Sequence, residues 1–268
     1  MHHADSIGLV AGNGRFPLLF AESARKLGHR VIAVAHRGET DPKLEELVPS
    51  LHWVRLGQLG KVIEALKAEG VSRAVWAGGL DKKRIFHARP DLRGLKLLAK
   101  LKVRGDDSIL RALASEFERE GIEIVAPTDF MLDRMAPHGP LGRHRPSGPQ
   151  DQDVAMGMGV ARSVGRVDVG QTVVLKDGII VAVEAIEGTD ECIRRGGALA
   201  RRGAVVCKVA KPGQDMRFDV PAVGPATITV MREAHAEVLA VEAGKTLVLD
   251  KEELVRAADR AGIVVVGV

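Results

Sequence analysis

The sequence predicts an α/β protein of two domains, and three observations carry that prediction. The chain has 268 residues, more than a single small domain needs. In its first half, short apolar segments rich in β-branched residues alternate with helical patterns, which is typical of a parallel sheet covered by helices. Residues 137–149 then include four prolines and three glycines, a density that disfavours both helix and sheet.

These observations give a domain division. We expect a Rossmann-like parallel-sheet domain over residues 1–136, a linker over 137–150 and a C-terminal mixed α/β domain over 151–268. In the first domain, Gly28 and Gly70 end two of the predicted helices. The pattern there predicts strands over 7–11, 30–35, 73–77 and 122–126, and helices over 18–27, 59–69, 92–102 and 108–120.

The second domain opens on a predicted hairpin. Asp177-Gly178 separates two apolar runs, 172–176 and 179–184, and this dipeptide is a strong signal for a two-residue hairpin turn. The remaining pattern predicts helices over 190–202, over 228–233 and from residue 250 onward, and strands over 205–209, 237–241, 246–249 and 263–268.

Composition excludes several classes of protein. A chain that is 46% hydrophobic and 28% charged is neither disordered nor collagen-like. Its 39 basic residues nearly balance 35 acidic ones and only 3% are aromatic, so we expect no nucleic-acid partner. Cys192 and Cys207 lack metal-ligand spacing and are expected to be free thiols. Because no apolar run reaches a membrane span and no signal peptide is recognised, we expect a cytoplasmic protein.

A glycine-rich turn follows the first predicted strand. Gly12-Asn13-Gly14 stands where doubly wound sheets bind phosphates, between a strand and the start of a helix. It is a defective dinucleotide fingerprint, because Pro17 replaces the third glycine and His36-Arg37-Gly38 replaces the acidic residue after the second strand. Three alternatives stay open: a phosphate site, an NADP site that uses Arg37, and a tight turn without a ligand.

A second loop is predicted to face the first. Gly78-Gly79 ends a parallel strand, and Asp81 is followed by three cations, Lys82 among them. Loops at the carboxyl ends of parallel strands line one edge of the sheet. The charged run either holds a phosphate together with a metal or is a solvated surface.

In the second domain, four carboxylates lie within the eight residues Glu184–Glu191. Their mutual repulsion predicts a compensating Mg²⁺ ion or helix N-terminus, unless the helix is simply capped there and the glutamates are solvated. The segment 208–227 follows, rich in Lys, Gln, Asp and Gly, and is either a binding loop or a solvated one. Cations that neutralise phosphates beside carboxylates that hold a metal favour a diphosphate-type ligand.

Three segments carry a family resemblance. Residues 7–17, 183–190 and 211–219, the last followed by Gly224-Pro225, resemble the LpxI-type UDP-2,3-diacylglucosamine pyrophosphatases of lipid A biosynthesis, over essentially the whole chain. The resemblance implies Mg²⁺-dependent hydrolysis of UDP-2,3-diacylglucosamine to UMP and 2,3-diacylglucosamine 1-phosphate, called lipid X. It also implies a cytoplasmic homodimer that associates loosely and transiently with the inner membrane.

The resemblance assigns roles to residues, most of them in the second domain. Asp190, Asp215 and Lys208 are the expected catalytic residues, and the two aspartates are also the expected metal ligands. The expected substrate-binding residues are Gly12, Asn13, Arg15, Gly79, Asp81, Lys82, Gln171, Thr189, Lys211, Gln214 and Thr227.

One position departs from the family pattern. After Gly224-Pro225 the pattern has an aspartate as a third catalytic and metal-binding residue, and this chain has Ala226. The departure predicts a chain that binds the substrate with little or no turnover. An NADP-dependent oxidoreductase and a non-catalytic nucleotide-lipid binding protein are the alternative functions.

Overall fold

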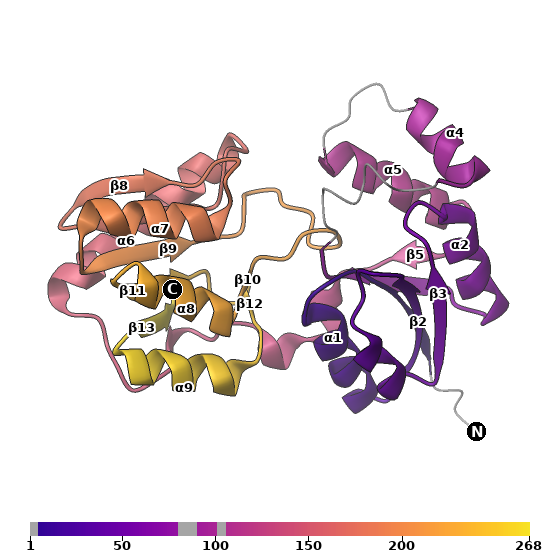
Figure 1. The fold of residues 1–268 in the computed structure, drawn as a ribbon, viewed down its shortest axis with the longest axis horizontal. Coiled ribbons are helices and arrows are strands. Elements are labelled where there is room, and N and C mark those ends of the chain that lie inside the picture. Colours follow the sequence, from indigo (N-terminus) through magenta and orange to yellow (C-terminus); the bar gives the residue numbers. More distant parts are fainter. Residues whose placement is uncertain (1–4, 80–89, 101–105) are drawn as a thin grey trace. The chain divides into compact units, whose positions relative to one another are not determined.

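The computed structural model describes residues 5–79, 90–100 and 106–268. The chain divides into two compact units (Figure 1). Unit 1 consists of Met1–Leu132 together with the short segment Met216–Phe218, and unit 2 consists of Asp133–Asp215 and Asp219–Val268. One described segment therefore leaves the second unit in sequence and packs with the first.

Unit 1 is built on a five-stranded parallel sheet in the order β3-β2-β1-β4-β5. The chain builds outward from β1 in one direction and then continues from β4 in the other, so the order reverses between these two strands. The strands are β1 (Ser6–Ala11), β2 (Arg30–His36), β3 (Ser50–Val54), β4 (Arg73–Ala77) and β5 (Glu123–Ile124).

Helices cover both faces of this sheet (Figure 1). One face carries α2 (Leu59–Ala68), α4 (Leu92–Lys100) and α5 (Asp106–Glu118), whose apolar residues form a core with Ile32 and Val34 of β2. The other face carries α1 (Phe16–Lys26), where Phe20 meets the ring of Phe130 edge to face. Short 3-10 turns complete the unit, namely Pro42–Glu46, Pro127–Phe130 and, at its border with unit 2, Leu132–Arg134.

Unit 2 is built on a six-stranded mixed sheet in the order β6-β13-β11-β9-β7-β8. Its strands are β6 (Gly139–Pro140), β7 (Thr172–Lys176), β8 (Ile179–Val183), β9 (Ala204–Lys208), β11 (Ala236–Val241) and β13 (Val264–Gly267). A separate parallel pair joins β10 (Ala222–Val223) to β12 (Leu247–Val248). Within the six-stranded sheet, β9, β11 and β13 are parallel, and β7 is antiparallel to both β8 and β9.

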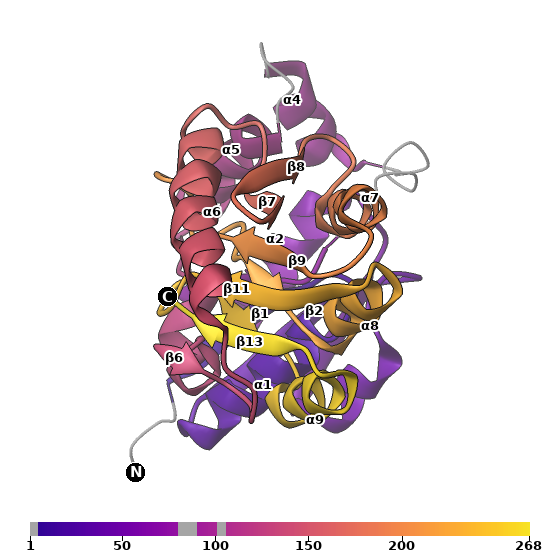
Figure 2. The ribbon, with the colours of Figure 1, turned by 90° about the vertical axis from the view of Figure 1, so that its left-hand side faces the viewer.

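Four helices sandwich the sheet of unit 2, as Figure 2 shows end-on. One face carries α6 (Gly148–Arg166), and its residues Met158 and Ala161 pack on β7 and β9. The other face carries α7 (Thr189–Ala200), α8 (Pro225–Glu233) and α9 (Lys251–Ala261), which share one core with residues such as Leu239. The predicted fold class, a parallel α/β domain followed by a mixed α/β domain, is confirmed.

The structure differs from the sequence prediction at several places. Strands β3 and β10 and helix α6 were not predicted, and residues 137–150 are not an irregular connection. Gly139–Pro140 forms an edge strand against β13, where a proline lacking an N–H group is tolerated. Pro149 stands in the first turn of α6, a position that needs no N–H donor, and Ser147 with Gln150 forms a capping box there.

Candidate functional site

The carboxyl ends of β1 and β4 bring the two predicted glycine loops of unit 1 together. Asn13 N–H donates to Gly79 O at 2.7 Å, and Gly12 N–H donates to Ala77 O at 2.8 Å. Asn13 and Gly79 also form an isolated antiparallel bridge. The prediction that these loops face each other is confirmed, and they lie where the strand order reverses, the usual ligand position of such sheets.

This contact requires glycine. A Cβ atom at position 12 would lie 2.2 Å from Gly79 O, closer than any real carbon–oxygen contact. Gly78 adopts φ +88°, and a Cβ there would lie 2.4 Å from Asn13 O. At this edge of unit 1, glycines leave the backbone uncovered, so the backbone can approach a ligand closely.

Gly12, Asn13 and Gly79 are called here the glycine edge, and side chains from β2 and the turn after it hold this edge in place. Asn13 Nδ2 donates to Glu39 Oε2 at 3.0 Å, and Thr40 Oγ1 donates to Ala11 O at 2.7 Å. His36 Nδ1 lies 3.0 Å from the same carbonyl oxygen, which can only accept, so the ring nitrogen carries the proton. Burial lowers the pKa of His36, against the opposing effects of this hydrogen bond and of Glu39.

The other substrate-binding residues expected in unit 1 are less informative. Arg15 is exposed and precedes α1 as its N-cap, and its side chain makes no capping hydrogen bond. Asp81 and Lys82 lie outside the described residues. The described part of the glycine edge therefore rests on Gly12, Asn13 and Gly79.

The strand directions in unit 2 bring a second set of predicted residues together at one edge of its sheet. Because β7 is antiparallel to β8 and β9, strands β8, β9, β11 and β13 all point the same way. Their carboxyl ends meet the amino end of β7, where Gln171 and Thr172 lie. Glu184 follows β8 and Lys208 ends β9, and α7 begins at Thr189 beside them. Residues distant in the sequence thus share one edge, called here the charged edge.

Lys208 is the centre of the charged edge. Its residue is only 8% exposed, and its Nζ donates to Thr189 Oγ1 at 3.3 Å and to Ala222 O at 3.1 Å. Burial lowers the pKa of Lys208, whereas the charges of Glu184, Asp219 and Asp190 raise it. An ammonium group has three N–H donors, so within the described residues one remains for an anionic ligand.

The hydrogen bonds around Thr189 have one consistent direction. Its hydroxyl donates to Glu184 Oε1 at 3.1 Å, which uses its single proton. Thr172 Oγ1, 3.3 Å from Thr189 Oγ1, must then be the donor of that pair, and Lys208 donates to the same oxygen. Glu184 Oε2 also accepts the N–H of Gln171 at 3.3 Å. Sequence reasoning left Glu184 out of the site, although it joins two of the predicted residues.

Gln171 supplies a further sign of a ligand. Its side-chain Oε1 is buried and has no hydrogen-bond partner among the described residues. A buried amide oxygen without a donor is costly, on the order of 1–3 kcal/mol. A ligand hydroxyl or N–H group at the charged edge would satisfy it.

Two of the four carboxylates of Glu184–Glu191 have arginine partners. Glu187 pairs with Arg195 at 2.5 Å and Glu191 pairs with Arg194 at 2.6 Å, both within α7 or its preceding loop. The pKa of Glu187 is lowered, first by its hydrogen bond from Arg195. Glu187 and Glu191 are therefore compensated by arginines of α7, and the Mg²⁺ ion or helix N-terminus expected for this segment stays a prediction.

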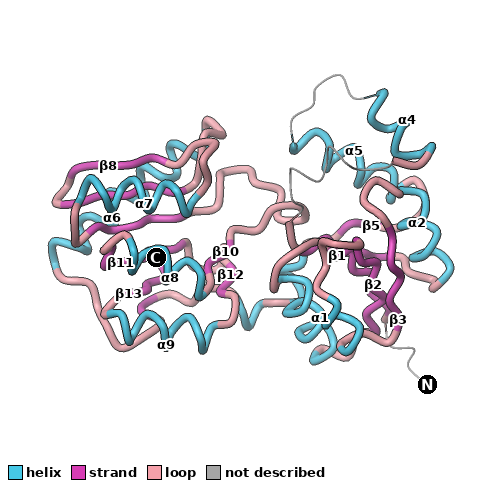
Figure 3. The backbone as a smooth tube through the Cα atoms, in the orientation of Figure 1, coloured by secondary structure: helices cyan, strands magenta, loops and turns pink. Residues whose placement is uncertain are grey.

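The loop between β9 and β10, long and without helix or strand (Figure 3), carries three more predicted residues. Lys211 Nζ forms an ion pair with Asp168 at 2.7 Å, and the Asp168 side chain is 83% exposed. Gln214 Oε1 accepts the N–H of Lys211, and its Nε2 donates to Asp219 Oδ2 at 2.6 Å. Asp215 O accepts the N–H of Asp219. These contacts order the loop but do not bring Lys211 to Lys208.

The start of α8 holds the position that departs from the family pattern. Ala226 is exposed in the first turn, and Thr227 Oγ1 accepts the N–H of Gly224 at 3.3 Å, which caps the helix. In the described parts of the chain, no three His, Cys, Asp or Glu side chains come together as a metal site. Within the described residues, Asp190 and Asp215 belong to no such group, and Mg²⁺ binding by them stays a prediction.

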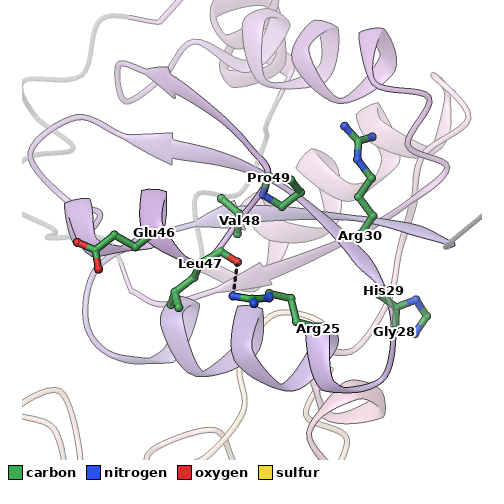
Figure 4. A pocket seen from close by; sticks show the side chains of 8 residues that line it. All are labelled: Arg25, Gly28, His29, Arg30, Glu46, Leu47, Val48 and Pro49. Carbon is green, nitrogen blue, oxygen red and sulfur yellow. Dashed lines mark hydrogen bonds between the residues drawn. The ribbon is translucent and has the colours of Figure 1, made fainter.

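A hollow of about 470 Å³ in unit 1 lies elsewhere (Figure 4). It is lined by residues at the amino ends of β2 and β3, the edge opposite the glycine loops. Its cations already have partners, since Arg25 donates to Leu47 O and Arg30 pairs with Glu69. This hollow is not the candidate site.

The two edges define the class: an α/β protein of two units, with a glycine edge in one and a buried lysine at a strand edge in the other. Comparison with known families is consistent with this division. The family model described as LpxI N-terminal domain matches residues 6–134, and the model described as LpxI C-terminal domain matches residues 137–266. The chain belongs to the LpxI family.

Two individual proteins illustrate how far this similarity extends. The chain is 37% identical to the UDP-2,3-diacylglucosamine pyrophosphatase LpxI of Caulobacter vibrioides over 98% of this chain and 97% of that protein. A solved structure of an ADP complex of N5-carboxyaminoimidazole ribonucleotide synthetase covers 74% of this chain and 46% of its own, at 13% identity and a TM-score of 0.28. The second likeness is too weak to carry an argument.

Proposed function

We propose that this chain binds UDP-2,3-diacylglucosamine and hydrolyses its diphosphate to UMP and lipid X, slowly because of Ala226. The observation that carries the proposal is Lys208, a buried cation beside the first turn of α7. Two of its three N–H donors have partners among the described residues, which leaves one for a ligand. The name of the Caulobacter relative supports the substrate. Family membership favours this hydrolase over an NADP-dependent oxidoreductase.

In the proposed reaction, a water oxygen bonds to one phosphorus while the bond from that phosphorus to the bridging oxygen breaks. The bridging oxygen keeps the bonding electrons and leaves with the other phosphate, and the proton of the water passes to solvent. Lys208 neutralises the negative charge that develops on the phosphate oxygens, and the free N–H groups at the start of α7 add positive potential. Gly188 caps α7 without a side chain, so its first amides are open to a ligand. Gln171 Oε1 accepts from the ligand.

Because residue 226 is an alanine, the catalytic carboxylate that the family pattern has at this position is missing. In the family pattern, an aspartate at this exposed position in the first turn of α8 is the third carboxylate with Asp190 and Asp215. We propose that Mg²⁺ dependence and fast turnover both require that carboxylate. Bound Mg²⁺ would supply charge stabilisation at the phosphates.

One experiment tests this proposal. The chain and its Ala226→Asp variant are incubated with UDP-2,3-diacylglucosamine in detergent micelles, with Mg²⁺ or with a chelator, and UMP release is measured. We expect the variant to release UMP at least 100-fold faster than the parent and only with Mg²⁺. A folded variant that releases no UMP contradicts the hydrolase proposal, and tight binding without turnover in both proteins favours a non-catalytic binding protein.

The glycine edge of unit 1 is proposed as a second contact for the substrate, through Asn13 and the backbone around Gly12 and Gly79. Arg15, Asp81, Lys82, Lys211, Gln214 and Thr227 remain proposed contacts of the same ligand. Crystals of the parent chain grown with UDP-2,3-diacylglucosamine would show which of them touch it.

We also propose that α4 mediates the transient contact with the inner membrane. Among the described residues, no helix is both long and apolar enough to cross a bilayer. On α4, however, Leu92 is 78% exposed and Leu95 is 50% exposed, with exposed Lys96 beside them on the helix. Residues 81–105 include nine Lys or Arg and only two Asp, although the whole chain carries a formal charge of +4. Exposed leucines within a basic segment fit an anionic lipid surface.

Vesicle binding tests this contact. The chain is sedimented with vesicles that contain phosphatidylglycerol and, separately, with vesicles of phosphatidylcholine alone. We expect binding to the anionic vesicles only, weakened by salt and largely lost in Leu92→Glu. Leu199→Glu is the matched control, because Leu199 is a 63% exposed leucine on α7. Equal loss in both variants contradicts a specific role for α4.

The proposed homodimer has a candidate surface in the free edge of β8. This strand is the last of its sheet, and its sequence Ile-Ile-Val-Ala-Val contains neither charge nor proline. Edge strands of this kind pair with other chains. Sedimentation should give a dimer mass for the parent and a monomer mass for Ile179→Lys; a dimer in both would place the interface elsewhere.

A further inference from the structure

Glu184 is the most buried acidic group in contact with the predicted residues of the charged edge. It is 7% exposed and directly follows β8, and each of its carboxylate oxygens accepts a hydrogen bond from a residue of that edge. Oε1 accepts the hydroxyl of Thr189 and Oε2 accepts the N–H of Gln171. A carboxylate this deeply buried is costly unless it is paired and fully hydrogen-bonded, so its place calls for an explanation.

The backbone of Glu184 packs closely against Gly170. A Cβ atom at Gly170 would lie 2.1 Å from Glu184 O, so the backbone from which the Glu184 side chain extends is held in a tightly packed position.

By fixing the direction in which the Thr189 hydroxyl donates, Glu184 determines which group Thr189 offers to Lys208. Because the proton of Thr189 is held by Glu184, the hydroxyl oxygen presents only lone pairs to its other neighbours. Lys208 can donate to that oxygen, and the position of its ammonium group is fixed between Thr189 and Ala222 O. Without the carboxylate, the hydroxyl is free to rotate and Lys208 loses one of its two anchors. The negative charge also offsets the burial that disfavours a cation at Lys208.

We propose that Glu184 is a positioning residue: it aims the Lys208 ammonium group at the phosphates of the ligand at the charged edge, and the Gln171 side-chain oxygen at a hydroxyl or N–H group of the same ligand. It acts through Thr189 and the Gln171 backbone and does not touch the ligand itself. The inference rests on the proposed function, because the ligand is taken to be the diphosphate of the UDP-sugar.

The test compares two buried carboxylates of unit 2. Asp153 on α6 is 6% exposed and accepts the N–H groups of Asp177 and Gly178 at 2.9 and 2.7 Å. These partners form the hairpin turn at the opposite edge of the sheet. Glu184→Gln and Asp153→Asn each remove one charge without changing shape. For each full-length variant, the melting temperature and the Kd for UDP-2,3-diacylglucosamine in detergent micelles are measured.

We expect both variants to melt at a lower temperature and only Glu184→Gln to weaken binding, by at least tenfold. In the Ala226→Asp background, Glu184→Gln should also lower kcat, and Glu184→Asp should recover part of the loss. Thr189→Val, which removes the hydroxyl that Glu184 holds, should weaken binding similarly, and the double variant should be little worse than either single one. Thr189→Val keeps the test decisive if Glu184→Gln does not fold.

Three results would overturn the inference. Glu184→Gln and Asp153→Asn could weaken binding equally, which shows general destabilisation. Glu184→Gln could bind as tightly as the parent, or Thr189→Val could leave binding unchanged. Failure of the parent chain itself to bind the UDP-sugar overturns the proposed function and this inference together, so the two failures are distinguishable.

Discussion

Both units place a candidate site at the carboxyl edge of parallel strands, but they build it from different groups. The glycine edge of unit 1 consists of backbone, with Gly12 and Asn13 packed against Gly79. The charged edge of unit 2 consists of side chains, with Lys208, Thr189 and Glu184 in one hydrogen-bonded chain. A backbone site is specified by a few adjacent glycines, whereas the side-chain site needs residues from three separate elements.

The largest expected effect is at the charged edge. Lys208→Met leaves the carboxylate of Glu184 buried without its neighbouring cation, which should cost about 3 kcal/mol of unfolding free energy. Binding of the UDP-sugar should become undetectable in the same variant. Calorimetric unfolding and titration calorimetry measure the two effects.

Lys176→Met provides the control for Lys208→Met. Lys176 ends β7 at the opposite edge of the same sheet, and its Nζ donates to Ala200 O and Arg202 O. Loss of these exposed or half-buried hydrogen bonds should cost roughly 1 kcal/mol and leave binding unchanged. Similar binding losses in the two variants would show that the charged edge is not the ligand site.

The glycine edge should be sensitive to a single methyl group. Gly12→Ala places a Cβ against Gly79 O and should lower the stability of unit 1 by about 2 kcal/mol. Gly14→Ala should cost less, roughly 1 kcal/mol, because position 14 has φ +82° but open space around it. Both tryptophans, Trp53 and Trp76, lie in unit 1, so their fluorescence during urea unfolding reports this unit alone. Equal losses would mean that the close approach to Gly79 is unimportant.

A smaller effect is expected from the side chain that braces the glycine edge. Asn13→Ala removes the hydrogen bond to Glu39 and should cost about 1 kcal/mol in the same tryptophan assay. The Kd for the UDP-sugar should rise as well if Asn13 contacts it. A variant with unchanged stability would show that the hydrogen bond does not order the loop in solution.

The smallest effect at neutral pH concerns the core beneath the charged edge. Burial raises the pKa of Cys192 and Cys207 from the ordinary 9.0 to about 12. The unfolded chain releases these protons first, so they make stability fall as pH rises from about 9 to 12 and have no effect at pH 7. The double variant Cys192→Ala, Cys207→Ala should show a shallower fall in unfolding free energy over that range. An identical slope in parent and variant would contradict the raised pKa values.

The sequence predicted most elements, and the failure to predict α6 and β3 has identifiable reasons. Helix α6 contains Gly157, Gly159 and Gly165, which lower helix propensity. The structure uses the first of them for packing, since a Cβ at Gly157 would lie 2.5 Å from Cys207 Sγ. Strand β3 reads Ser-Leu-His-Trp-Val, and as an edge strand with polar residues it lacks the apolar run of a buried one. In both cases tertiary packing outweighed local propensity.

The two candidate sites also differed in how well the sequence predicted them. The facing of Gly12 and Gly79 followed from a parallel sheet and was predicted correctly. At the charged edge, Thr189 and Lys208 were predicted, but Glu184 was grouped with three other acids, to be compensated by Mg²⁺ or a helix N-terminus or else solvated. Sequence spacing does not show that Arg194 and Arg195 reach back to pair with two of those acids. Only the fold separates the carboxylate that faces Lys208 from its neighbours.

The segment Met216–Phe218 limits how this protein can be divided experimentally. The ring of Phe218 lies 5.3 Å from that of Trp76 and packs on the core of unit 1, although it is encoded some eighty residues after the rest of that unit. A fragment that ends near residue 132 would expose the Trp76 ring to water. Unit 1 expressed in this way should be less stable and more prone to aggregate than the same unit in the whole chain.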